Sequence, residues 1–140
     1  MSAAMKKTRS VSESRQLLVQ VRNALLTLHK ALIDGERERY ESTIGQIKSP
    51  NQFLHLLTHD PWFVWLQPFS QLIVTMDELL EEKEPLTVAG VETLVRQTRL
   101  LLVPGEQAEG FSGHYFVALQ ANPDVVLAHA AAKDLIVRKK

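Results

Sequence analysis

The chain has 140 residues, of which 45% are hydrophobic and 23% charged, so its composition is that of one ordinary globular domain. It carries 16 basic and 16 acidic residues, and this balance gives no reason to expect nucleic acid as a partner. Cysteine is absent, which excludes disulfides and thiolate chemistry and fits a cytoplasmic location. No apolar run reaches the roughly 18 residues that a transmembrane helix needs.

Residues 1–11 are small, polar or basic, and we expect them to form a disordered arm ahead of a single helical domain at 12–140. A helix is predicted to begin near Ser12 or Glu13, because leucine and valine then recur at steps of three and four. This stripe consists of Leu18, Val21, Leu25, Leu28 and Leu32. A helix over 12–46 would be roughly 50 Å long, so we expect it to project beyond the domain or to bend at Gly35 or Gly45.

Gly35 stands at the next core position after this stripe, where the missing side chain leaves a notch. We expect an aromatic side chain from residues 62–69 to fill the notch. The charged residues at 34–39 are of mixed sign at helical pair spacing, which is typical of a solvated helix face.

An aromatic stretch, His59–Phe69, contains both tryptophans of the chain. It is apolar almost all the way round, so we expect it to lie inside the protein as the anchor of its core. The anchor residues are Trp62, Phe63, Trp65 and Phe69. A short helix should start at Ser49-Pro50, and Asp60-Pro61 should start a longer one that bends at Pro68 and ends at residues 81–85.

Three further helices are predicted after this stretch. Thr87 caps the first of them, with Leu86 and Val91 spaced as a hydrophobic staple, and Pro104-Gly105 ends it. Asn122-Pro123 then separates a helix that contains Phe111 and Leu119 from a last helix that runs to about Val137. The expected fold is therefore all-α, an antiparallel bundle of four main helices plus one or two short ones.

The histidines are the first candidates for a metal site. His55 and His59 lie four residues apart, the spacing at which two imidazoles share a helix face and can bind one metal ion. His29 is a candidate third ligand for a divalent metal. No histidine follows a glutamate by three residues, so the carboxylate di-iron pattern is absent, and no local motif marks a catalytic residue.

The aromatic stretch has the sequence HDPWFVWLQP, and it resembles an HDPWFxWLxP-like stretch of small bacterial all-helical proteins to which no activity is assigned. Residues 122–129 have a similar character. The resemblance implies a bacterial origin and a helical fold. The His55–His59 spacing is also similar to that of metal-dependent helical bundles of the DinB type, although the three-histidine set of that family is matched only at this pair.

These patterns favour a non-enzymatic helical module that binds a protein partner or self-associates as a homo-oligomer, without a cofactor. One alternative is a metal-dependent bundle enzyme that uses His55, His59 and a further histidine. A second alternative is a peripheral membrane binder, because Trp62, Trp65 and Phe69 could form a wedge for a membrane surface.

Overall fold

The computed structural model describes residues 10–81, 85–106 and 109–137, and within these ranges the chain is helical with no strand. The helices are α1 (Val11–Thr43), α2 (Pro50–His59), α3 (Pro61–Val64), α4 (Gln67–Glu81), α5 (Val88–Leu101), α6 (Phe111–Ala121) and α7 (Pro123–Ile136). The predicted all-α class is confirmed. The expected disorder of the N-terminal arm concerns residues 1–9, which lie outside the described residues, whereas residues 10 and 11 belong to the start of α1.

Helix α1 begins with a capping box. The Ser10 hydroxyl accepts a hydrogen bond from the Glu13 backbone N–H at 3.1 Å, and the Glu13 carboxylate accepts one from the Ser10 N–H at 2.9 Å. Each bond satisfies a backbone donor that a helix start otherwise leaves free. The predicted start at Ser12 or Glu13 was slightly late, because the pair that caps the helix begins at Ser10.

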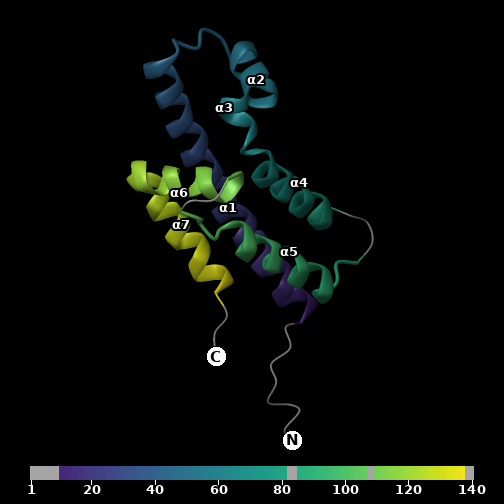
Figure 1. The fold of residues 1–140 in the computed structure, drawn as a ribbon. Helices are drawn as coiled ribbons and strands as arrows, with labels where there is room; N and C mark the ends of the chain where they lie inside the picture. The colour runs from purple at the N-terminus through teal and green to yellow at the C-terminus, as the bar shows by residue number, and fades with distance from the viewer. Residues whose placement is uncertain (1–9, 82–84, 107–108, 138–140) are drawn as a thin grey trace, which may run out of the picture.

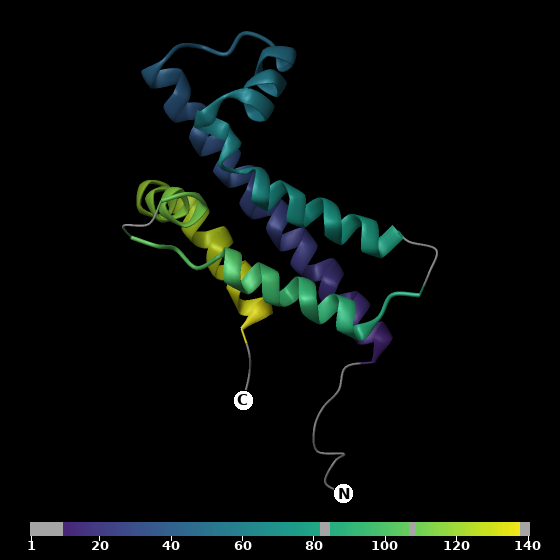
Figure 2. The ribbon, with the colours of Figure 1, turned by 45° about the vertical axis from the view of Figure 1, so that its right-hand side comes forward.

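Helix α1 is the element against which most of the others pack. Its predicted apolar stripe is confirmed, since each of the five side chains is at most 1% exposed. Figures 1 and 2 show α4, α5 and α7 lying against α1, with α6 crossing near the middle of the molecule. The helix continues without a break through Gly35 and ends at Thr43, before Gly45. The outer end of α1 projects beyond the main body, and α2 and α3 pack beside it (Figure 1).

The apolar side chains form two separate clusters. The larger one combines the α1 stripe with residues of α4, α5, α6 and α7, among them Phe69 and Tyr115. The smaller one lies at the far end of α1 and has Ile47, Leu56 and Phe63 at its centre. The two clusters share α1, so this one helix connects the main body of the protein to its outer end.

The aromatic stretch is split between two helices instead of forming one bent helix. Helix α3 ends at Val64, α4 begins at Gln67, and Pro68 is the second residue of α4. Proline lacks the N–H that a helix interior needs and clashes with the carbonyl four residues before it. The helix therefore stops ahead of Pro68, whereas the first turn of a new helix tolerates it. The predicted bend is in fact a break.

The later helices begin and end where the sequence predicts. The Thr87 hydroxyl accepts a hydrogen bond from the Gly90 N–H at 3.0 Å, and the predicted staple residues Leu86 and Val91 are both buried. The Asn122 side chain caps α7 by accepting a hydrogen bond from the Asp124 N–H at 2.9 Å. These caps fix the points at which the chain reverses.

Candidate functional site

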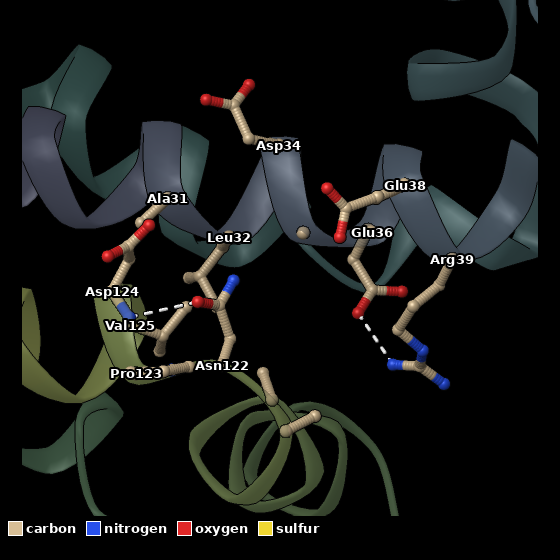
Figure 3. A pocket seen from close by; sticks show the side chains of 13 residues that line it. Ala31, Leu32, Asp34, Glu36, Glu38, Arg39, Asn122, Pro123, Asp124 and Val125 are labelled. Carbon is tan, nitrogen blue, oxygen red and sulfur yellow. Dashed lines mark hydrogen bonds and ion pairs between the residues drawn. The ribbon is translucent and has the colours of Figure 1, made fainter.

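A pocket of about 300 Å³ lies between α1 and the turn that joins α6 to α7. Figure 3 shows α1 above it and the start of α7 below it, with side chains from both reaching toward the space between them. Gly35 lies on the α1 side of the pocket, and Asn122 and Asp124 lie on the other. The pocket is thus built by residues that are far apart in the sequence.

The notch at Gly35 is occupied by Asn122. A β-carbon built on Gly35 would lie 2.6 Å from the Asn122 Nδ2 atom, closer than any ordinary van der Waals contact. The prediction that an aromatic side chain from residues 62–69 fills the notch is therefore wrong. A glycine here lets the cap residue of α7 approach the α1 backbone, so the close approach joins α7 to α1 at the wall of the pocket.

Glu36 is the buried carboxylate of this pocket. Its side chain is 8% exposed, and its Oε2 atom accepts a hydrogen bond from Arg39 Nη1 at 2.9 Å. Burial raises the pKa of Glu36, although the positive charges of Arg39 and His114 act in the opposite direction. The Trp62 indole donates a hydrogen bond to the Glu36 backbone carbonyl at 3.3 Å. The prediction of a solvated face over 34–39 is wrong at this residue, because α3 and α6 place Trp62 and His114 near it.

The residues lining this pocket carry more negative than positive charge. The basic side chain among them is Arg39, and the acidic ones are Asp34, Glu36, Glu38 and Asp124. Such a pocket can receive an ammonium or guanidinium group, which would reduce the repulsion among the carboxylates. Within the described ranges, no three histidine, cysteine, aspartate or glutamate side chains are grouped so that they could hold a metal ion.

The four aromatic residues of the predicted core anchor have different environments. Phe63 and Phe69 are fully buried, but in different clusters: Phe63 in the smaller and Phe69 in the larger. Trp62 and Trp65 are only partly buried, so the expectation that the whole stretch lies inside the protein is wrong for the two indoles. Trp62 packs at the edge of the smaller cluster, beside α1. Trp65 packs at the edge of the larger cluster and stacks on His114, with ring centres 5.0 Å apart. The stretch therefore spans the junction between the two clusters.

The three histidines of the predicted metal site do not form one group. His55 and His59 are exposed on α2, with their rings stacked at 4.4 Å. His29 is half-buried on α1 and forms a hydrogen bond with Ser70 at 2.8 Å. The divalent-metal alternative stays a prediction, confined to the exposed pair on α2.

A second polar pair lies between α6 and α7. The fully buried Tyr115 hydroxyl lies 2.5 Å from the Nδ1 atom of His129. Burial raises the pKa of Tyr115, and burial together with the charge of Lys133 lowers the pKa of His129. Both groups therefore favour their neutral forms, and the imidazole tautomer decides which of the two donates in this hydrogen bond. The sequence offered no sign of this pair, because its members lie on different helices.

Comparison of the chain with protein-family models, with curated proteins and with solved structures finds no match. The resemblance of the aromatic stretch to small bacterial helical proteins thus stays a prediction. In the part of the chain that the structure describes, every helix is too short or too polar to cross a membrane.

Proposed function

We propose that the protein is a helical module that binds a protein partner or a second copy of itself. The binding surface is the outer face of α7, defined by Val126, Leu127, Ala130 and Ala131. In this proposal α1, α4, α5 and α7 act as an antiparallel four-helix framework that supports this face. The observation that supports it best is the exposure of apolar side chains along α7.

Helix α7 is apolar on both of its sides. Its inner side chains, which face the main cluster, are buried: Val125, Ala128, Ala132 and Ile136. On the outer face, Leu127 is 70% exposed and Val126 is 45% exposed. Neighbouring exposed apolar side chains of this kind often mark a site of protein–protein interaction. Another surface covering this face would therefore remove the exposed apolar area from water.

The composition of the outer face favours a protein over a membrane. Ala130 and Ala131 are small, so a helix of the partner can approach α7 closely. Lys133 and Asp134 follow with opposite charges, whereas interfacial membrane helices are typically rich in basic residues on their polar side. The acidic pocket lies at the start of the same helix, where it can receive a basic side chain of the partner.

Leu127→Glu tests the surface directly. Full burial of a leucine side chain is worth roughly 1.5–3 kcal/mol, so its replacement by a charge should weaken association by more than about tenfold. Leu54→Glu is the matched control, because Leu54 is 60% exposed but lies on α2, at the other end of the molecule.

Light scattering over a range of concentrations measures self-association, and capture by the immobilised protein measures partner binding. We expect Leu127→Glu to abolish the complex and Leu54→Glu to preserve it. If both variants behave like the unchanged protein in both assays, the outer face of α7 is not the binding surface. Co-sedimentation with anionic liposomes that depends on Leu127 would instead favour the membrane alternative.

A further inference from the structure

A second pocket, of about 310 Å³, lies at the junction between the two apolar clusters. It is lined by residues from α1, from α2 and from the segment that runs from α3 into α4. Much of its wall is apolar, with Ile33, Leu57, Phe63 and Leu66 lining it. Its polar side chains include a hydroxyl and an imidazole in direct contact, those of Ser70 and His29.

The Ser70 hydroxyl has two acceptors within reach. The His29 Nε2 atom lies 2.8 Å from its oxygen, and the Leu66 carbonyl oxygen lies 3.4 Å from it. A hydroxyl has one proton, and the shorter contact is in the normal range for a strong hydrogen bond. When the imidazole proton is on Nδ1, the Ser70 hydroxyl donates to His29 Nε2, which is the arrangement of a nucleophile and its general base; when it is on Nε2, the ring donates to Ser70 and Ser70 donates to the Leu66 carbonyl.

His29 is held in this position by its surroundings. Its ring packs against Phe69, with ring centres 5.4 Å apart. Burial lowers the pKa of His29, and within the described ranges the side chains that line the pocket include no other titratable group. The imidazole is therefore neutral near pH 7 and able to accept a proton.

We propose that Ser70 is a nucleophile activated by His29, and that the pocket accepts an ester with a short apolar acyl group. The apolar wall suits the acyl chain, and the amide groups of Gln67 and Gln71 at the pocket can donate to the ester carbonyl. This reaction is independent of the association through α7, so either proposal can fail without the other.

In the first step, Ser70 Oγ attacks the carbonyl carbon while its proton passes to His29 Nε2. The bond between the acyl carbon and the leaving oxygen then breaks, and that oxygen takes the proton from His29 and departs as an alcohol. Water attacks the acyl-serine in the same way and releases a carboxylic acid, which restores both side chains. Among the described residues, no carboxylate lines the pocket to orient His29. Loss of that group costs about 10⁴-fold in serine proteases, so we expect reaction with activated esters and slow turnover.

The test uses the full chain and a fluorophosphonate probe, with p-nitrophenyl butyrate as the ester. Peptide mass spectrometry should place the probe on Ser70. The control variant is Ser42→Ala, because Ser42 donates to a backbone carbonyl of its own helix, that of Arg39, at 3.2 Å, and among the described residues it forms no hydrogen bond with a histidine.

We expect Ser70→Ala to abolish labelling, His29→Gln to slow it by about 100-fold, and Ser42→Ala to leave it unchanged. In the unchanged protein, the labelling rate should rise with pH through the titration of His29, and His29→Gln should remove that rise. Labelling spread over several serines, or no labelling of Ser70 in the unchanged protein, would overturn the proposal whether or not the variants fold.

Discussion

The contact between Gly35 and Asn122 leads to a prediction that combines two opposing effects. In an ordinary exposed helix position, Gly→Ala stabilises the helix by about 1 kcal/mol. At Gly35 the new methyl group would lie 2.6 Å from the Asn122 Nδ2 atom, so the amide must move. The same side chain caps α7 through its other terminal atom, Oδ1, and loss of a cap typically costs about 1 kcal/mol. We therefore expect Gly35→Ala alone to change the free energy of unfolding by about zero.

A double-mutant cycle separates the two effects. Asn122→Ala alone should destabilise by about 1 kcal/mol, because α7 loses its cap. In the Asn122→Ala background the amide that would clash with the new methyl group is gone, so Gly35→Ala should stabilise the protein by about 1 kcal/mol. Urea denaturation followed by circular dichroism gives the four free energies, and we expect a coupling of about 1 kcal/mol between the two sites. Equal effects of Gly35→Ala in both backgrounds would show that Asn122 does not fill the notch.

Two further predictions concern Glu36 and the two apolar clusters. Burial raises the pKa of Glu36 in the folded chain above its value in the unfolded chain. At pH values between these two, the folded chain binds a proton that the unfolded chain does not. The free energy of unfolding should therefore increase as the pH falls through the folded pKa. Glu36→Gln should remove this contribution, which urea midpoints of both proteins across acidic pH would reveal; parallel curves would contradict it. Phe69→Ala should destabilise the whole chain by about 3–5 kcal/mol, whereas Phe63→Ala should mainly loosen α2 and α3, a difference that amide hydrogen exchange resolves by helix. Uniform loss of protection in Phe63→Ala would show that the two clusters unfold together.

Local signals in the sequence were reliable guides to the helices. The caps at Ser49, Thr87 and Asn122 use side chains and backbone groups within three residues of each other, so their spacing alone reveals them. The stripe from Leu18 to Leu32 is similarly periodic and is buried as expected. The sequence was less reliable at the aromatic stretch, where one apolar run proved to serve two clusters.

The candidate sites depend on contacts that no local pattern encodes. His29 and Ser70 lie 41 residues apart, and Tyr115 and His129 lie on different helices. The sequence around Glu36 is typical of a charged, solvated segment, whereas in the fold α3 and α6 lie near this side chain and it is buried. Gly35 was correctly identified as a notch, but the residue that fills it comes from α7.

The sequence by itself determined that the chain is helical, where most of its helices start and stop, and which side of α1 faces the core. These properties follow from hydrogen bonds and apolar spacing within one or two helical turns. Only the tertiary structure decided which distant side chains share a pocket, which charges are buried, and which apolar face of α7 remains exposed. The physical reason is that burial and polar contact between helices depend on how the helices pack, and many packings satisfy the same stripe of leucines.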